Sequence, residues 1–273
     1  MKTELVILDL DGTLLNENHK INNETKEYLN ILKNNNIKIV IATGRTFTAA
    51  KKYYNELKLE TPLISCNGGY IYDPISEKIV EGHEIKKQTL NNIFKILEKN
   101  NAFFQFYTSN TIYSTEIKFL LKDWIKQNET LSEKDRINIE LIENATEMLN
   151  SINEPVFKLL AIENDIEKFE YLMEEFNKIE GIEIVSSFNG AIDIMVKGIT
   201  KGQALKNISN YLNIPISKTM AIGDNNNDAT MLKEANIGIA MENATSLAKE
   251  NADFITTSNS NNGVLNALKK HFE

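Results

Sequence analysis

The chain has 273 residues, of which 42% are hydrophobic and 25% are charged, as in soluble globular proteins with one large domain or two smaller ones. Its formal net charge of −8 argues against a protein that binds nucleic acid or an anionic membrane surface through a basic face. The single cysteine, Cys66, excludes an intrachain disulfide, and because we find neither a signal peptide nor a run of about 18 apolar residues, we expect a cytoplasmic protein without a membrane span.

Strand and helix patterns alternate along the first third of the chain. Short apolar runs at residues 5–8, 37–42 and 62–66 each end in polar or glycine residues, which is typical of buried strands that lead into loops. Apolar side chains at helical spacing separate these runs at residues 22–34 and at about 46–57. This alternation predicts a parallel α/β sheet.

The pattern changes in the middle of the chain. Residues 70–72 and 78–80 flank Asp73 and Pro74 and predict a β-hairpin. From about residue 84 to 188 the order is helix, two strands, helix, and then strand, helix, strand. The strands expected there are 103–107, 111–114, 156–162 and 182–185, with a helix near 165–178. We interpret this region as a separate α+β unit.

The α/β alternation resumes after about residue 189. A helix is expected from residue 201 to about 212, and apolar strands are expected at 219–222, 237–240 and 254–255, before a final helix. The predicted fold is therefore α/β, with a Rossmann-like parallel sheet and helices on both of its faces. This core would comprise residues 1–82 and 189–273, and the inserted α+β cap would comprise residues 83–188.

Polar residues cluster at the predicted strand ends. In open α/β sheets ligands bind at the carboxyl ends of the strands, so these residues are candidates for one site. The residues at the ends are Asp9, Asp11, Thr43, Asn67, Asp224 and Asp228, and Lys201 opens a helix between the last two strand ends. Four carboxylates, one cation and one hydroxyl are thus expected along a single edge.

Acidic residues form two clusters at these strand ends, Asp9 with Asp11 and the segment 223–228. Asp9 and Asp11 would repel each other unless a cation lies between them, and oxygen ligands without nearby His or Cys favour Mg²⁺ over zinc. Taken alone, the pair is explained equally well by an Asx turn. The second cluster, residues 223–228, could by itself be a solvated loop. Together the clusters suggest a divalent metal between two strand ends.

Two further positions suit an anion. Thr43 and Gly44 lie where a strand meets a helix, and free backbone amides at a helix start bind anions. The simpler interpretation is an N-cap, for which Thr46 is also available. Lys201 could be a solvated lysine, but a cation at a helix start opposes the helix dipole, which indicates a functional reason. Arg45 could contact substrate or pair with an acid.

These motifs resemble those of the haloacid dehalogenase superfamily. Asp9-Leu10-Asp11-Gly12-Thr13-Leu14 matches its DxDGT[LV] first motif, and IATGR with Thr43, KGITKGQAL with Lys201 and GDNNND at 223–228 follow in the family's order. The segments ISCNGG, AMENA and NNGVLNAL resemble the Cof-type branch. That branch carries a large α/β cap between its second and third motifs, where the insertion is predicted.

The resemblance implies a Mg²⁺-dependent phosphatase that hydrolyses small phosphorylated metabolites, such as sugar phosphates or phosphorylated cofactors. Asp9 would be the nucleophile that forms an aspartyl phosphate, and Asp11 would be the general acid and base. Mg²⁺ would be held by Asp9, the Asp11 main-chain carbonyl and Asp224, while Asp228 would hold the metal's waters or orient Lys201. The phosphoryl oxygens would be bound by Thr43, Gly44 and Lys201, assisted by Asn227 and the Leu10 amide.

Two other functions remain open at this point. The same core could transfer a phosphoryl group within a sugar, as a phosphomutase does, if the cap excludes water. It could also be a phosphoacceptor or ligand-binding module without turnover, although receiver domains are about half as long and lack such an insertion. The expected partner is a small phosphorylated metabolite rather than nucleic acid or a membrane, and the sequence does not indicate an oligomeric state.

Overall fold

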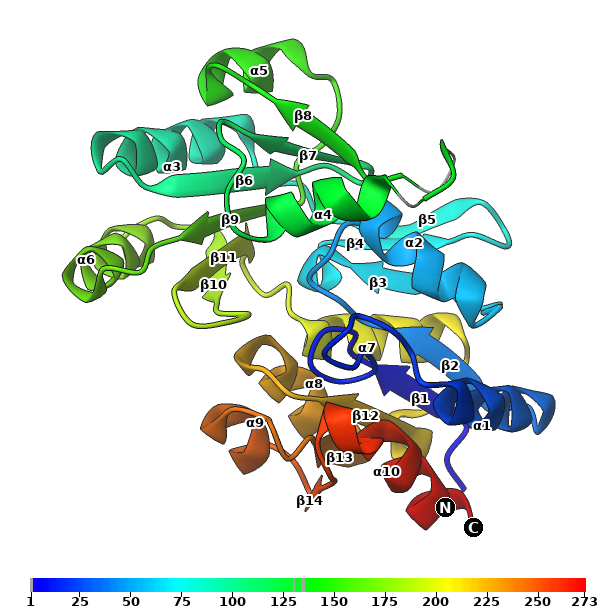
Figure 1. Ribbon diagram of the computed structural model, residues 1–273. Coiled ribbons are helices and arrows are strands. Elements are labelled where there is room, and N and C mark those ends of the chain that lie inside the picture. The colour runs from blue at the N-terminus through cyan, green and yellow to red at the C-terminus, as the bar shows by residue number, and fades with distance from the viewer. Residues whose placement is uncertain (1, 130, 134–135) are drawn as a thin grey trace.

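The structure is a computed structural model that describes residues 2–129, 131–133 and 136–273. A parallel sheet forms its lower half, with the strand order β14-β13-β12-β1-β2 (Figure 1). Its strands are β1 (Leu5–Leu8), β2 (Lys38–Ile41), β12 (Thr219–Gly223), β13 (Ile237–Ala240) and β14 (Phe254–Ile255). Strands from the two ends of the chain therefore share one sheet, as predicted.

Strand β1, which lies between β12 and β2, is apolar along its whole length. All four residues of β1 are buried, because β12 and β2 flank it and helices cover both faces. A strand buried on both faces needs a continuous apolar run. The packed helix pairs are α1 (Asn23–Asn34) with α10 (Gly263–Phe272), and α7 (Lys201–Tyr211) with α8 (Ala229–Glu234). Figure 1 shows the first pair in front of the sheet and the second behind it, so the predicted α/β class is confirmed.

A second, mostly antiparallel sheet lies above the first, in the order β10-β11-β9-β6-β7-β8 (Figure 1). Its strands are β6 (Phe103–Tyr107), β7 (Thr111–Ser114), β8 (Asn138–Leu141), β9 (Lys158–Ile162), β10 (Ile182–Val185) and β11 (Ala191–Val196). One face packs against α3 (Lys87–Lys99), α5 (Ala145–Ser151) and α6 (Ile166–Asn177). The other face packs against α4 (Leu120–Asn128) and residues of the first half of the chain.

Two strands of the six-stranded sheet, β8 and β11, and the helix α5 that packs on it were not predicted from the sequence. β11 lies after residue 188, the predicted end of the insertion, yet it pairs with both β9 and β10. The domain boundaries stay a prediction, and we propose to place the end of the inserted unit after Val196. We choose this boundary because a unit that ended at residue 188 would lack β11, the strand that lies between β9 and β10 in the sheet.

A small third sheet corrects one expectation. We predicted residues 62–66 as the third parallel strand of the core, but β3 (Leu63–Ser65) forms an antiparallel sheet with β4 (Tyr70–Asp73) and β5 (Lys78–Gly82). Only one parallel bridge, Ala42 to Ile64, links β3 to β2 within the described residues. The turn at Cys66 and Asn67, whose φ angles are 51° and 56°, reverses the chain after β3, and β3 therefore pairs with β4 in an antiparallel way. The predicted hairpin at 70–80 is confirmed as β4 and β5.

The remaining helices complete the connections between strands. They are α2 (Phe47–Glu56) after β2 and α9 (Ser246–Glu250) after β13. In the part of the chain that the structure describes, no helix is both long and apolar enough to cross a membrane.

Candidate active site

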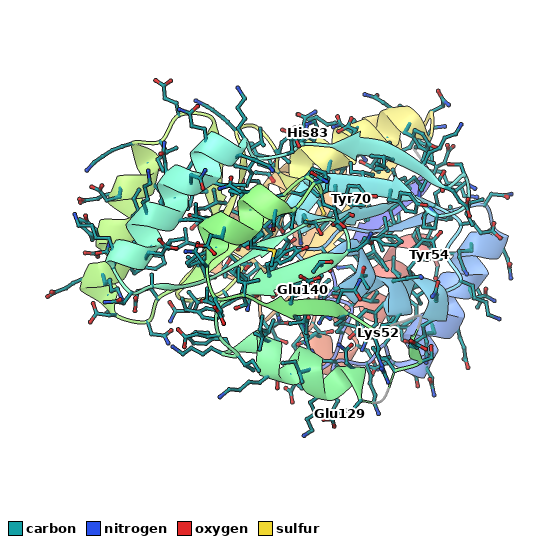
Figure 2. The ribbon with its side chains drawn as sticks, turned by 90° about the horizontal axis from the view of Figure 1, so that it is seen from above. Lys52, Tyr54, Tyr70, His83, Glu129 and Glu140 are labelled. Atoms are coloured by element: carbon teal, nitrogen blue, oxygen red, sulfur yellow. The ribbon has the colours of Figure 1, made fainter. Side chains whose placement is uncertain are left out.

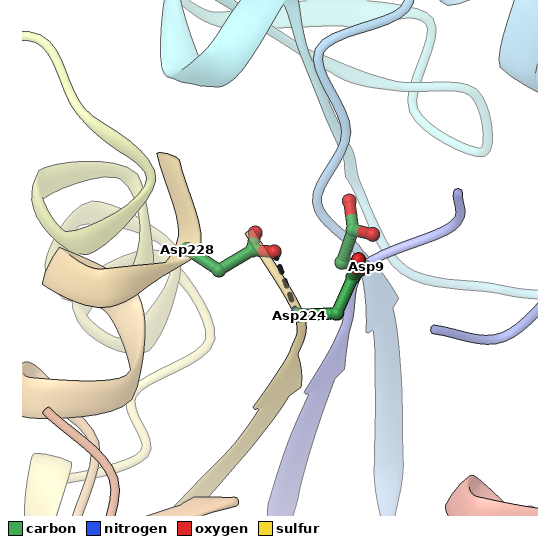
Figure 3. Close-up of side chains that lie close together, drawn as sticks. All are labelled: Asp9, Asp224 and Asp228. Carbon is green, nitrogen blue, oxygen red and sulfur yellow. Dashed lines mark hydrogen bonds between the residues drawn. The ribbon is translucent and has the colours of Figure 1, made fainter. Parts of the chain in front are cut away.

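Three aspartates meet at the carboxyl ends of the central strands. Asp9 follows β1, Asp224 follows β12, and Asp228 lies in the 3₁₀ turn before α8. One oxygen of each carboxylate lies within 4.8 Å of the others, and all three residues are buried (Figure 3). Parallel strands bring their ends to one edge, so residues more than two hundred positions apart in sequence become neighbours.

Lys201 lies inside this cluster and is only 1% exposed. Its Nζ donates to Asp9 Oδ1 and to Asp228 Oδ1, both at 2.6 Å. Asp228 Oδ2 accepts from the amides of Asp224 at 3.0 Å and Asn225 at 2.9 Å. Both oxygens of Asp228 therefore have partners, and Lys201 at the start of α7 is held by carboxylates rather than by water. We call Asp9, Asp224, Asp228 and Lys201 the carboxylate floor.

The charges of the carboxylate floor do not balance. Three carboxylates face one ammonium, which leaves an excess of two negative charges, the charge that one divalent cation neutralises. Burial and then the Asp228 charge raise the pKa of Asp9 well above its usual range. The same two causes raise the pKa of Asp224 to about 7. Buried oxygen ligands with excess negative charge fit a hard divalent cation such as Mg²⁺.

Residues of the first motif shape the floor from one side. Thr13 Oγ1 donates to Asp224 Oδ1 at 2.7 Å, which fixes the direction of that carboxylate. Gly12 has a φ of 80°, and a Cβ at this position would collide with the Asp224 carboxylate. The glycine is thus required by its backbone angle and by its close approach to Asp224.

Asp11 is held differently from Asp9. Arg45 clamps both of its oxygens, with Nε 2.7 Å from Oδ2 and Nη2 2.6 Å from Oδ1. Desolvation opposes ionisation, but the guanidinium outweighs it and lowers the pKa of Asp11. The Asp11 side chain is 47% exposed and lies outside the carboxylate cluster. Its predicted contribution to a metal site, the main-chain carbonyl, stays a prediction.

The turn after β2 carries the candidate anion-binding residues. Thr46 is the N-cap of α2, accepting from the Ala49 amide, so the cap does not require Thr43. Thr43 is buried, and its Oγ1 accepts from the Arg45 amide at 3.1 Å. Gly44 follows it and lies against Asn67, since a Cβ on Gly44 would be 2.9 Å from Asn67 Oδ1.

Asn227 joins this turn to the floor. Its Nδ2 donates to Asn67 Oδ1 at 3.0 Å, and its own Oδ1 is buried without a hydrogen-bond partner among the described residues. A buried amide oxygen without a partner is costly, which is consistent with a ligand or water at this position. Leu10, the other predicted assistant, is fully buried between the two acids. The roles of both in phosphate binding stay predictions.

A cavity of about 840 Å³ opens above the floor. Its lower side includes Asp9, Asp11, Thr43, Gly44, Asp224 and Asn227. Its upper side comes from the middle of the chain and includes Tyr107, Trp124 and Phe188, which we call the aromatic wall. Trp124 lies on α4, and Lys52 on α2 lines the cavity beside it; both helices lie on the same side of the molecule (Figures 1 and 2).

Two charged residues of the six-stranded sheet that line or adjoin the cavity were not predicted from the sequence. Lys158 begins β9 and Asp193 lies within β11, where they form a buried ion pair. Lys158 also lines the cavity. A charged residue inside an otherwise apolar strand, as in Lys158-Leu-Leu-Ala-Ile and Ala-Ile-Asp193-Ile-Met-Val, is the signal that could have found them.

Comparisons with known proteins agree with this arrangement. The family model of haloacid dehalogenase-like hydrolases matches residues 6–268. The phosphatase YwpJ of Bacillus subtilis is 30% identical, with 97% of this chain and 99% of that protein covered. The 5-amino-6-(5-phospho-D-ribitylamino)uracil phosphatase YcsE of the same organism is 29% identical, over 97% of this chain and 94% of that protein.

A solved structure gives the same result for the fold. A haloacid dehalogenase-like hydrolase from B. subtilis superimposes with a TM-score of 0.86 at 27% identity, covering 99% of this chain and all of the other. The resemblance and the enzyme class predicted from the motifs are confirmed by these matches. The chain therefore belongs to the haloacid dehalogenase-like hydrolases, and its relatives YwpJ and YcsE in this family are phosphatases.

Proposed function

We propose that this protein is a Mg²⁺-dependent phosphatase that hydrolyses small phosphorylated metabolites through an aspartyl phosphate on Asp9. The observation that carries the proposal is the position of Asp9. Asp9 directly follows the buried strand β1 and lines the same cavity as Asp11. Its Oδ1 lies 2.6 Å from Lys201 Nζ. A nucleophile, a second acid and a cation around one cavity are the parts that phosphomonoester hydrolysis requires.

In the first step an Asp9 oxygen attacks phosphorus, and the bond between phosphorus and the leaving oxygen breaks. A proton on Asp11 passes to that oxygen, so the leaving group departs as an alcohol. Lys201 and the turn of Thr43 and Gly44 bind the phosphoryl oxygens as the charge on them is redistributed.

In the second step water attacks the phosphorus of the aspartyl phosphate. Asp11, now a carboxylate, takes the proton from that water, and the bond between phosphorus and Asp9 breaks. Asp9 returns as a carboxylate, and inorganic phosphate leaves. The Arg45 clamp on Asp11 favours the carboxylate form, which suits this step. To carry the proton of the first step, Asp11 has to leave the clamp.

The carboxylate floor supports the proposed cofactor. Asp9 and Asp224 would hold Mg²⁺, together with the main-chain carbonyl of Asp11, and Asp228 would bind its waters or orient Lys201. When bound, the ion would supply charge neutralisation for the phosphoryl oxygens. The excess of two negative charges on the floor is what such an ion would balance.

The cavity supports a small substrate. A volume of about 840 Å³ is of the size that encloses one metabolite rather than a protein segment or duplex nucleic acid. Sugar phosphates and phosphorylated cofactors are both candidates. The relative YcsE is by its name a phosphatase of 5-amino-6-(5-phospho-D-ribitylamino)uracil, which joins a phosphorylated sugar-alcohol chain to a planar ring. The aromatic wall favours a leaving group with an apolar or planar face.

Two observations weigh against the other functions. A phosphoacceptor module needs no second acid, whereas Asp11 faces the same cavity as Asp9. A phosphomutase must exclude water from its aspartyl phosphate, whereas the Asp11 side chain is 47% exposed. Hydrolysis is therefore the function that this site supports best.

The experiment is hydrolysis of 4-nitrophenyl phosphate and of a panel of metabolite phosphates, with Mg²⁺ and with a chelator, by the wild-type protein and by Asp9→Asn. We expect release of inorganic phosphate with Mg²⁺ and a loss of at least about 1,000-fold in kcat for the variant, because the amide is not a nucleophile. Retained Mg²⁺-dependent hydrolysis by Asp9→Asn would refute the proposal. Isomerised sugar phosphate without free phosphate would indicate the phosphomutase.

A further inference from the structure

Lys158 is a buried cation that the proposed chemistry does not use. It opens β9 in the six-stranded sheet, is 3% exposed, and lines the cavity that contains Asp9. The face of the Tyr107 ring lies 5.4 Å from its Nζ. A lysine on this sheet could have reached solvent through its long side chain, but this one points toward the first half of the chain.

The partner of Lys158 is also buried. Asp193 on β11 is 0% exposed and forms an ion pair with the Lys158 ammonium. Among the described residues, neither oxygen of Asp193 accepts a conventional hydrogen bond. Removing two charges from water is costly, and without further hydrogen bonds the attraction between them repays that cost poorly. Stability alone therefore gives a weak reason for this pair.

The ammonium reaches across the cavity to the other half of the site. Lys158 Nζ donates to the Gly44 carbonyl at 3.0 Å, and a Cβ built on Gly44 would lie only 3.2 Å from the same nitrogen. Gly44 belongs to the turn that is proposed to bind phosphate. Lys158 is thus the cation that the six-stranded sheet places in contact with this turn.

One donor of this ammonium remains for a ligand. A lysine ammonium has three N–H groups, and in the described part of the chain Lys158 contacts only the Gly44 carbonyl and Asp193 as polar partners. Asp193 lies on the neighbouring strand β11 and holds the ammonium through their ion pair. The third N–H has no polar partner among the described residues, and Lys158 lines the cavity together with Gly44.

We infer that Lys158 binds a phosphoryl oxygen of the substrate from the side of the six-stranded sheet, and that Asp193 orients it. The floor and the sheet then each contribute a lysine, Lys201 from below and Lys158 from above. This inference rests on the proposed function, because it takes the turn of Thr43 and Gly44 as the phosphate site. It adds a substrate contact to that site from the inserted part of the chain.

The test measures binding of inorganic phosphate, which has no leaving group, by titration calorimetry of the full chain with Mg²⁺. The double variant K158M/D193N removes both charges, so that no unpaired charge is left buried. We expect it to bind phosphate at least about tenfold more weakly, the effect of losing one charge-assisted hydrogen bond. Lys158→Arg, which keeps the cation, should stay within about threefold of the wild type.

A matched control removes an ion pair elsewhere. Lys206 and Glu234 form an exposed pair at 2.8 Å outside the cavity, so K206M/E234Q deletes the same charges and should bind phosphate as the wild type does. A folded K158M/D193N protein with phosphate affinity within about twofold of this control would overturn the inference. So would a raised KM for one substrate only, because that result places Lys158 at the leaving group.

Two provisions keep the test decisive. If K158M/D193N does not fold, K158Q/D193N, which also leaves no unpaired charge buried, takes its place, and the same thresholds for phosphate affinity apply. Calorimetry needs no turnover, so it separates this inference from the proposed function. Absence of hydrolysis by the wild type refutes the function, whereas normal hydrolysis with unchanged phosphate affinity in the variant refutes only the role of Lys158.

Discussion

The carboxylate floor and the aromatic wall face the same cavity but are built in opposite ways. In the floor, Lys201 and Asp228 have their polar atoms held by named partners at 2.6–3.0 Å. The wall consists of rings from a strand, a helix and a loop. The Trp124 ring lies over the Arg45 guanidinium, with 6.0 Å between the ring centroid and Arg45 Cζ. The floor is fixed by directional bonds and the wall by packing.

This difference separates two tasks. Phosphoryl transfer requires charges placed to within a fraction of an ångström, which a buried hydrogen-bonded network at strand ends provides. Recognition of a leaving group requires shape and apolar surface, which can vary without disturbing the charges. Substitutions in the floor should therefore change kcat and stability together, whereas substitutions in the wall should change mainly KM.

The largest effect is expected from Lys201→Met. The substitution leaves Asp9 and Asp228 without their cation, so we expect a loss of about 3–5 kcal/mol in the free energy of unfolding. We also expect kcat to fall by about 100- to 1,000-fold. Urea unfolding and steady-state kinetics measure the two effects.

Metal removal sharpens this prediction. Because Mg²⁺ would neutralise the same carboxylates, part of the lost stability should return when Mg²⁺ is added to Lys201→Met, and a chelator should remove it again. If Lys201→Met loses the same stability with Mg²⁺ and with chelator, Mg²⁺ does not neutralise the carboxylates that Lys201 neutralises, and the prediction is wrong.

A smaller and different effect is expected from Trp124→Leu. The ring is 7% exposed and lines the cavity, so its loss removes apolar contact with the leaving group. We expect KM for an aromatic phosphate to rise by about three- to tenfold, with kcat within about twofold. Trp124→Phe should recover most of the affinity. A fall in kcat with unchanged KM would break the division between floor and wall.

The floor could be predicted from the sequence because its signals are local and directional. Asp9, Asp224 and Lys201 each follow or begin an element whose pattern is clear, and parallel strands place such residues at one edge. The contact of Lys201 with Asp228 is one of the two roles that the family resemblance implied for Asp228, whereas the contact of Lys201 with Asp9 was not predicted. The ion pair of Arg45 with Asp11 was harder to predict, because Arg45 could equally have faced the substrate. The side-chain conformation in the structure shows that its partner is Asp11.

The wall and the Lys158 pair could not be predicted in the same way. Tyr107 and Trp124 are aromatic residues of the kind that fill a core, so the sequence alone does not mark them as cavity residues. Which face of the six-stranded sheet covers the cavity depends on how the sheet packs against the first half of the chain. The strand β3 failed for a related reason. Its apolar run fits a parallel strand, but the left-handed turn at Cys66 and Asn67 reverses the chain after it. The Asn67-Gly68 pair is a hairpin signal that could have predicted this reversal.

The smallest effect tests whether stability alone explains the floor. Asp73 ends β4 and accepts from Tyr211, near the end of the helix that Lys201 begins, at 2.9 Å. Asp73→Asn should lower the free energy of unfolding by about 1 kcal/mol at pH 7 and leave kcat/KM unchanged. If Asp73→Asn also loses activity, the activity lost in Lys201→Met is explained by a loosened α7 rather than by the missing charge.

The pH dependence of this variant provides its control. Burial alone would raise the pKa of Asp73, but hydrogen bonds from Ser76 and the Ile75 amide outweigh it and lower the pKa. A carboxyl whose pKa is lowered on folding contributes stability above its ordinary value of 3.8 and loses that contribution as the pH falls through the lowered pKa. The difference in unfolding free energy between wild type and Asp73→Asn should therefore persist from neutral pH down to about 4 and shrink below it. A difference that stays constant into acid would show that the shape of the side chain, and not its charge, ties the hairpin to α7.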